Sequence, residues 1–130
     1  MGRVLKYSDG DQIIKRGTKD QRMYIILSGK VDISINDGLK ELTLMTLQKH
    51  DFFGEISLFN DSPRTADAYA SGKVKLTYID NIKELDDFLK LNPSFSRKMA
   101  KTLAERIANT NSLLLKELGG KSHAVSKCYW

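Results

Sequence analysis

The feature that most constrains the fold is a series of short apolar runs between residues 4 and 79, separated by turn residues. The run Met23–Leu27 is nearly continuous, as in a well-buried strand, and Ser28-Gly29 is expected to end it. Residues 31–35 then alternate between apolar and polar side chains. That period of two is typical of a half-buried strand.

A hairpin signal follows this alternation. Asn36-Asp37-Gly38 is a strong turn sequence, and residues 42–47 return from it as a second apolar run. Residues 74–78 alternate again further along the chain. Many short strands at close spacing predict an antiparallel barrel or jelly roll, covering about residues 3–79.

The pattern changes to helical periodicity after Asp80. Asn81, with Glu84 three residues later, predicts a capped helix start. The apolar face of this helix would consist of Leu85, Phe88 and Leu89. Asn92-Pro93 should interrupt it, and a longer helix is expected from about Ser94 to Leu118, with Gly119-Gly120 as its stop.

Strands followed by helices define an α+β arrangement. The expected organisation is one domain over residues 1–120, with its helices at about 81–118 and a disordered tail at 121–130. On the long helix, a stripe of mainly apolar residues recurs at heptad-like spacing. Its members are Leu103, Ile107, Thr110 and Leu114.

Composition excludes several classes of function. The formal charge is +5, but the 21 basic residues are scattered among 16 acidic ones, so we expect no nucleic acid to bind this segment. A single cysteine, Cys128, excludes an internal disulfide and indicates a reducing, cytoplasmic setting. Nowhere do about 18 apolar residues run together, so no membrane contact by this segment is expected.

The most chemically informative stretch is Phe53–Phe59, followed by Pro63–Ala66. Gly54 would let the backbone come close to a ligand, Glu55 could accept hydrogen bonds from hydroxyls, and Arg64 would supply a fixed positive charge. Ile56, Leu58 and Phe59 predict one helical turn packed on the barrel, with its first amides facing an anion. Taken singly, each polar residue could belong to an ordinary surface turn. Their combination favours a site for a small phosphorylated sugar.

The two motifs Phe53–Leu58 and Pro63–Ala66 resemble the phosphate-binding cassette of the cyclic nucleotide-binding domain family. The early strands, through Met23–Val31, also match the pattern of that family, and the similarity extends over about residues 3–118. The resemblance implies that Arg64 pairs with the cyclic phosphate and that Glu55 accepts a hydrogen bond from the ribose 2′-hydroxyl. It further assigns ligand contacts to Gly54, Ile56, Ser57, Thr65 and Ala66.

The same resemblance suggests where the base would be recognised. Ile33 and Leu44 would be apolar walls, while Thr110 and Asn111 on the long helix would contact the purine. Thr65 would bear on the choice between cyclic AMP and cyclic GMP. Asp67 departs from the family pattern, which usually has a neutral residue there, and strand alternation is expected to point it away from the side that Ala66 faces.

The predicted function is therefore a regulatory sensor rather than an enzyme. It binds cyclic AMP, with cyclic GMP as the alternative, and signals by closure of the helix after Pro93. No cofactor is expected, because His50 and His123 are too few for the metal site of a cupin-type enzyme.

Two further expectations concern partners, and one concerns an alternative function. The long helix could form a homodimer, and an effector domain could belong to a longer parent protein, because a helix-turn-helix would need about 60 more residues after Leu118. The alternative function is a degenerate domain that keeps the fold for oligomerisation or scaffolding and binds no nucleotide.

Overall fold

The structure is a computed structural model that describes residues 3–36 and 38–118, apart from the side chains of Leu113 and Glu117. It divides into two compact units, Met1–Asp87 and Phe88–Trp130.

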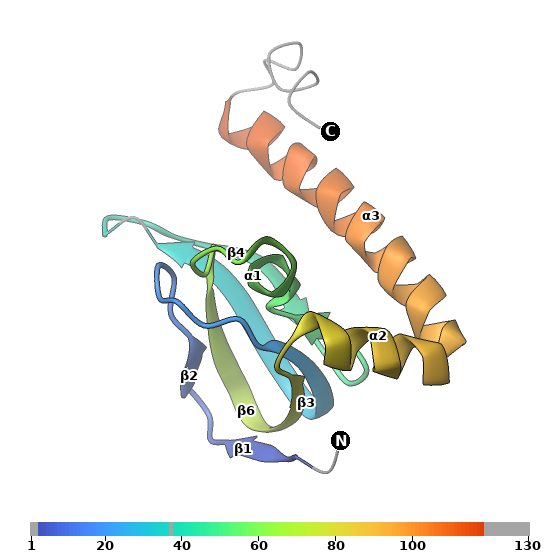
Figure 1. Ribbon diagram of the computed structural model, residues 1–130. Coiled ribbons are helices and arrows are strands. Elements are labelled where there is room, and N and C mark those ends of the chain that lie inside the picture. Colours follow the sequence, from blue (N-terminus) through green and yellow to red (C-terminus); the bar gives the residue numbers. More distant parts are fainter. Residues whose placement is uncertain (1–2, 37, 119–130) are drawn as a thin grey trace. The chain divides into compact units, whose positions relative to one another are not determined.

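The first unit is built on an antiparallel sheet, shown in Figure 1. The order of the main strands is β1-β6-β3-β4, while β2 pairs with β6 and β5 pairs with β3. The strands are β1 (Leu5–Tyr7), β2 (Gln12–Ile14), β3 (Met23–Asn36), β4 (Glu41–Leu47), β5 (Phe52–Phe53) and β6 (Asp67–Ile79). The predicted hairpin is confirmed, since β3 and β4 pair from Asn36↔Glu41 to Val31↔Leu47.

The prediction that Ser28-Gly29 ends a strand is wrong. Strand β3 continues through both residues for 14 positions, with irregular register against β6 on either side of Ser28. Gly29 has a φ of +90°, and a Cβ atom there would lie 2.2 Å from the carbonyl oxygen of Lys73. The glycine therefore allows a bulge and a close approach of β6, rather than a chain reversal.

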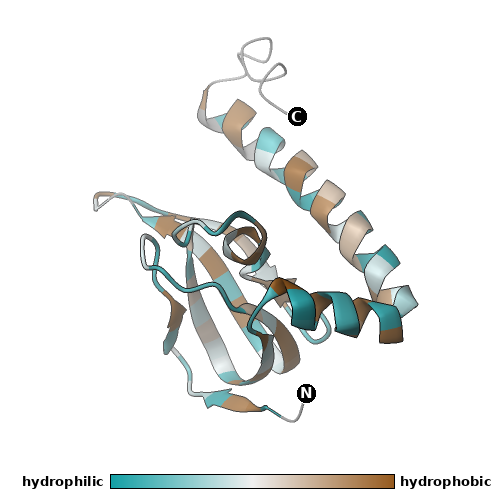
Figure 2. Cartoon of the chain, viewed as in Figure 1, coloured by the Kyte–Doolittle hydropathy of each residue, from teal (hydrophilic) through white to brown (hydrophobic). Residues whose placement is uncertain are grey.

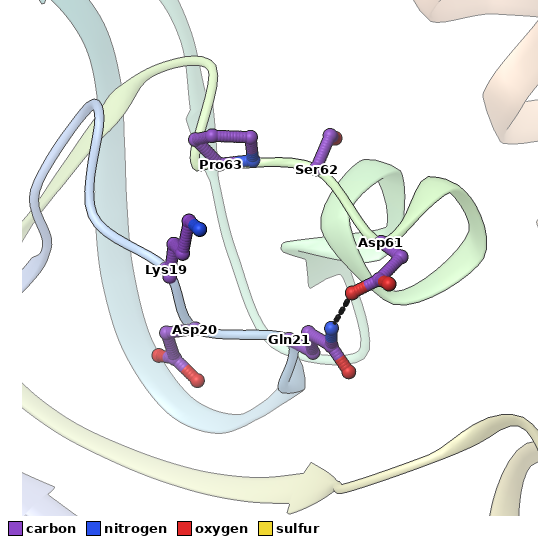
Figure 3. A pocket seen from close by; sticks show the side chains of 6 residues that line it. All are labelled: Lys19, Asp20, Gln21, Asp61, Ser62 and Pro63. Carbon is purple, nitrogen blue, oxygen red and sulfur yellow. Dashed lines mark hydrogen bonds between the residues drawn. The ribbon is translucent and has the colours of Figure 1, made fainter.

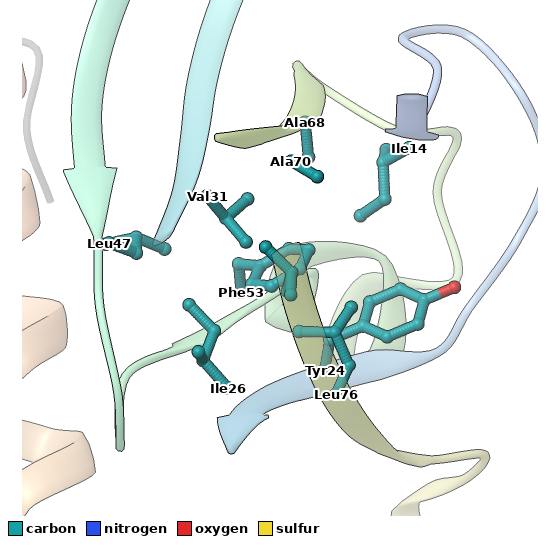
Figure 4. Packing of buried hydrophobic residues seen from close by; sticks show 10 residues of the cluster. Ile14, Tyr24, Ile26, Val31, Leu47, Phe53, Ala68, Ala70 and Leu76 are labelled. Carbon is teal, nitrogen blue, oxygen red and sulfur yellow. The ribbon is translucent and has the colours of Figure 1, made fainter. Parts of the chain in front are cut away.

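A cluster of apolar side chains fills the interior of this unit (Figure 4). Side chains alternate between buried and exposed along this part of β6: Val74 and Leu76 are buried, while Lys73 and Lys75 are exposed. The rings of Tyr24 and Phe53 stack with centroids 5.1 Å apart, which ties β5 to β3. The other buried members are Ile14, Ile26, Val31, Leu47, Ala68 and Ala70. Figure 2 shows the resulting alternation of hydrophobic and hydrophilic positions along the strands.

Helix α2 (Ile82–Leu91) begins where the sequence predicts it. The side-chain oxygen of Asn81 accepts a hydrogen bond from the backbone N–H of Glu84 at 2.9 Å, which confirms the predicted cap. Leu85 on its apolar face is buried, with only 1% of its surface exposed.

In the second unit, α3 (Pro93–Glu117) follows the predicted interruption. The side-chain amide of Asn92 donates to the carbonyl of Phe88 at 2.8 Å, and the rings of Phe88 and Phe95 meet edge to face at 5.0 Å. Along α3, Ile107 and Leu114 each expose 45% of their surface. The predicted stop at Gly119-Gly120 and the tail at 121–130 lie outside the described residues. Strands followed by helices confirm the α+β class.

Candidate anion-binding site

The candidate site begins at Gly54, between β5 and α1 (Glu55–Asn60). Its φ is +87°, a left-handed conformation that only glycine adopts without cost. A Cβ atom at this position would lie 2.6 Å from the carbonyl oxygen of Arg22 and 2.9 Å from Nη1 of Arg64. Gly54 is therefore required by both backbone conformation and space, and this close approach brings Arg22 into the site.

Arg64 is almost completely buried, with 4% of its surface exposed. Its Nη1 donates to the carbonyl of Gly54 at 3.0 Å, and its Nη2 donates to the carbonyl of Arg22 at 2.6 Å. The backbone of Arg64 is held as well, because its N–H donates to the carbonyl of Thr18 and its carbonyl accepts from the N–H of Gly17. Arg64, the residue predicted to bind the anion, is thus held in place by the segment that precedes β3.

The charge of Arg64 is balanced by Asp20, whose carboxylate lies 3.0 Å from Nη2. Burial raises the pKa of this carboxyl, but hydrogen bonds from Arg64 and from the backbone N–H of Arg22 lower it further, so the net pKa lies below its ordinary value. Asp20 is therefore a resident anion beside the guanidinium.

One donor of the guanidinium has no acceptor. Nε of Arg64 is buried and makes no hydrogen bond within the structure described. An unsatisfied buried donor costs about 1–3 kcal/mol, and more for a charged group. A buried unpaired donor of this kind is explained by local strain, by an enclosed water or by a ligand that reaches it once the surrounding atoms move.

The other predicted cassette residues lie around Arg64 in the sequence but differ in burial. Glu55 and Ser57 are buried, with 7% and 2% of their surfaces exposed. Ala66 is half-buried, and Thr65 is exposed. Glu55 opens α1, and the N-cap residue Gly54 makes no side-chain hydrogen bond to that first turn.

The packing predicted for this helical turn is only partly correct. The turn itself is confirmed as α1, and Leu58 is buried. Ile56 and Phe59, however, expose 45% and 51% of their surfaces. The buried residues of this six-residue helix are Glu55, Ser57 and Leu58, which leaves Ile56 and Phe59 on its exposed side.

The carboxylate of Asp67 accepts hydrogen bonds from other residues of the chain. The carboxylate accepts from the backbone N–H of Arg16 at 2.8 Å and from the side-chain amide of Gln12 at 3.3 Å. Asp67 is 8% exposed, and these contacts tie the start of β6 to β2. The acidic residue that departs from the family pattern thus has a structural explanation.

The predicted base-recognition residues lie on three different elements. Ile33 on β3 is half-buried and packs on the core, and Leu44 on β4 is half-buried opposite the irregular step in β3. Thr110 and Asn111 lie on α3, in the second unit. The hydroxyl of Thr110 donates to the carbonyl of Arg106 at 2.8 Å. The contact of these residues with a base stays a prediction.

A polar pocket lies beside the site, with a volume of about 380 Å³ (Figure 3). One wall comes from the segment before β3 and the other from the segment after α1, and the side chains of Gln21 and Asp61 form a hydrogen bond across it. The lining residues are Lys19, Asp20, Gln21, Asp61, Ser62 and Pro63.

Sequence reasoning missed Asp20 and Arg22. Both contact Arg64 through tertiary structure, and neither shares a motif or a spacing with the cassette.

Among the described residues, no group of three or more His, Cys, Asp and Glu could hold a metal ion. None of the helices in the described ranges is both long and apolar enough to cross a membrane.

Comparison with known proteins defines the class. The family model of the cyclic nucleotide-binding domain matches residues 4–92, so the chain belongs to that family. A CRP-like cAMP-activated global transcriptional regulator of Mycobacterium tuberculosis is 34% identical over 107 residues, which make up 81% of this chain and 47% of the regulator. A cGMP-dependent protein kinase of Plasmodium berghei is 32% identical over 117 residues, covering 81% of this chain and 13% of the kinase.

Solved structures agree with these relatives. The catabolite activator protein of Thermus thermophilus has a TM-score of 0.73 and 28% identity, covering 90% of this chain and 55% of that one. The regulatory domain of Toxoplasma gondii PKA, crystallised with cAMP, has a TM-score of 0.62 and 26% identity, covering 79% and 39% of the two chains. The predicted jelly-roll fold is therefore confirmed. The chain spans about half the length of the bacterial regulator that it matches.

Proposed function

We propose that this chain binds a cyclic mononucleotide, with cyclic AMP favoured over cyclic GMP, and acts as the sensor of a regulatory protein. The observation that carries the proposal is the buried guanidinium of Arg64, whose Nε has no acceptor among the described residues. Because protein atoms cover Nε, the proposal requires them to move; a cyclic phosphate would then supply that acceptor and a negative charge at once. The relatives named for cAMP and for cGMP support the ligand class.

The roles of the neighbouring residues follow from their positions. Gly54 leaves space beside the guanidinium and, as the N-cap residue of α1, makes no side-chain hydrogen bond to the first amides of that helix. Glu55, the buried first residue of α1, would accept a hydrogen bond from the ribose 2′-hydroxyl. The exposed Thr65 would be free to contact the base. We propose that closure of the helix after Pro93 transmits the signal to an effector domain in a longer protein.

The test is isothermal titration calorimetry with cyclic AMP and cyclic GMP, on the unmodified chain and on Arg64→Ala. Loss of charge-assisted hydrogen bonds, worth about 1.5–3 kcal/mol each, should weaken binding by at least about 100-fold. Because Arg64 also holds the backbone of its neighbours, circular dichroism must show that the variant is folded. The matched control is Lys75→Gln, which removes the same charge from an exposed position on β6.

A second function is favoured by the ion pair between Asp20 and Arg64. Since the carboxylate already neutralises the guanidinium at 3.0 Å, the domain could keep its fold without a nucleotide and serve as a scaffold or an oligomerisation module. The absence of heat with either nucleotide, from a folded chain, would overturn the sensor proposal in favour of this one. Sedimentation analysis would then test for a homodimer through α3.

A further inference from the structure

A cluster of two arginines, one tyrosine and two carboxylates lies on the first unit, outside the cassette. The guanidinium carbons of Arg3 and Arg22 lie 4.4 Å and 4.2 Å from the ring centroid of Tyr78. Cations near an aromatic ring are attracted by its quadrupole. We call Arg3, Arg22, Tyr78, Asp80 and Glu84 the arginine–tyrosine cluster.

The carboxylates of this cluster compensate the two like charges. One oxygen of Asp80 lies 2.8 Å from Arg3, and the other lies 3.2 Å from Nε of Arg22. Glu84 forms a second ion pair with Arg3. The hydrogen bond with Glu84, and after it the interaction with Tyr78, raises the pKa of the Arg3 guanidinium. The cluster is thus an electrically balanced connection between the start of the chain, the segment before β3, the end of β6 and the residues that follow it.

One end of the cluster reaches the start of α2. Glu84 accepts a hydrogen bond from the backbone N–H of Asp80 at 2.7 Å, which lowers the pKa of its carboxyl. Its own N–H donates to the side chain of Asn81 at 2.9 Å. Glu84, which binds Arg3, therefore lies in the first turn of α2, and Asp80, which binds both arginines, is hydrogen-bonded to it.

The other end of the cluster reaches the candidate phosphate site. The carbonyl of Arg22 accepts from Nη2 of Arg64 at 2.6 Å, and its N–H donates to Asp20 at 3.2 Å. The same carbonyl lies at the position that a Cβ atom on Gly54 would contact. Arg22 therefore contacts Arg64 through its backbone carbonyl. Its side chain contacts Asp80, whose backbone N–H is hydrogen-bonded to Glu84 in the first turn of α2.

We propose that Arg22 is a positioning residue for Arg64, and that its side chain couples the phosphate site to the first turn of α2. Asp80 and Tyr78 hold the Arg22 side chain, which fixes the direction of the Arg22 carbonyl and hence of the Arg64 guanidinium. A ligand that moves Arg64 must then also act on α2. The coupling to α2 rests on the proposed function, whereas the positioning of Arg64 by Arg22 does not.

A merely stabilising cluster would behave differently. Its ion pairs join side chains that are 33–41% exposed, and such pairs contribute about 0–1 kcal/mol to stability. Their removal would lower the melting temperature slightly and leave the environment of Arg64 unchanged. The decisive measurements therefore report on Arg64 itself.

The main variant is Arg22→Gln, which removes the guanidinium and keeps the backbone carbonyl. Lys75→Gln is its charge-matched control, since Lys75 forms no ion pair with any described residue. Arg22→Lys keeps the positive charge, so its effect on Arg64 should be smaller than that of Arg22→Gln. Asp80→Asn, alone and combined with Arg22→Gln, completes a double-mutant cycle.

The first readout is the proton–nitrogen NMR signal of Arg64 Nε in the chain without nucleotide. Arg22→Gln and Asp80→Asn should both move or broaden this signal, and the double variant should move it no further than the larger single effect. Lys75→Gln should leave it unchanged. If Arg22→Gln also leaves it unchanged, the positioning role is refuted.

The second readout is cyclic AMP binding by calorimetry, with the amide signals of Glu84 and Leu85 followed during the titration. We expect Arg22→Gln to weaken binding about threefold to tenfold and to abolish the ligand-induced shift at Glu84. Unchanged affinity and shift would refute the coupling. If the unmodified chain binds no nucleotide, the proposed function fails, while the signal of Arg64 still decides the positioning role.

Discussion

Replacement of Gly54 by alanine tests how the candidate site is assembled. Alanine at a φ of +87° incurs the left-handed penalty of about 1–2 kcal/mol. Its Cβ atom would also lie 2.6 Å from a backbone oxygen that cannot rotate away, and overpacking of this kind costs about 1–3 kcal/mol. The free energy of unfolding should therefore fall by about 2–5 kcal/mol in Gly54→Ala.

The matched control is Gly72→Ala. Gly72 has a φ of +77°, and a Cβ atom there would meet nothing within 4 Å. The free energy of unfolding of Gly72→Ala should therefore fall only by the penalty for the left-handed conformation, about 1–2 kcal/mol. The difference between the two variants isolates the close approach of Gly54 to Arg22 and Arg64.

Thermal unfolding followed by circular dichroism measures both variants. At roughly 4 °C per kcal/mol, Gly72→Ala should melt about 4–8 °C below the unmodified chain, and Gly54→Ala about 8–20 °C below it. Gly54→Ala should also lose nucleotide affinity, because the guanidinium must move to accommodate the methyl group. Equal melting temperatures and equal affinity in the two variants would show that the close approach is not real.

Three other substitutions test separate parts of the molecule. Glu55→Gln should reduce the preference for cyclic AMP over its 2′-deoxy analogue by about 1–3 kcal/mol in calorimetry; an unchanged preference would remove Glu55 from ribose recognition. The lowered pKa of Asp20 means that its contribution to stability is present above its ordinary pKa of 3.8 and is lost as the pH falls through the lower folded value. Melting temperatures of Asp20→Asn should therefore change less than those of the unmodified chain between about pH 4 and pH 2. Phe52→Ala, at a fully buried site, should cost about 3–5 kcal/mol in urea unfolding, and a loss under 1 kcal/mol would contradict the packing of β5.

The fold was largely predictable because its signals are local. Alternating side chains, the hairpin at Asn36, the cap at Asn81 and the break at Pro93 each depend on a few neighbouring residues. The error at Gly29 has the opposite cause. A glycine in an apolar run is equally compatible with a turn and with a bulge, and only the partner strand, through Lys73, decides between them.

The candidate site was predictable only in part for a similar reason. Gly54 and Arg64 are recognisable because the cassette is a contiguous motif. The contacts that orient Arg64 come from Asp20 and Arg22, more than 40 residues earlier in the chain, through one side chain and one carbonyl. Backbone acceptors leave no trace in the amino-acid sequence, since any residue provides one.

The attachment of Arg64 to residues 17–22 has a consequence for engineering. Four hydrogen-bonding partners of Arg64 lie in that loop: Gly17, Thr18, Asp20 and Arg22. The cassette is therefore not a portable module. Residues 53–66 transplanted into another β scaffold would carry the arginine without the groups that orient it, and any change in the length of the loop would act on the site as directly as a mutation in the cassette. A functional graft would have to transfer both segments, at the spacing that β3 gives them.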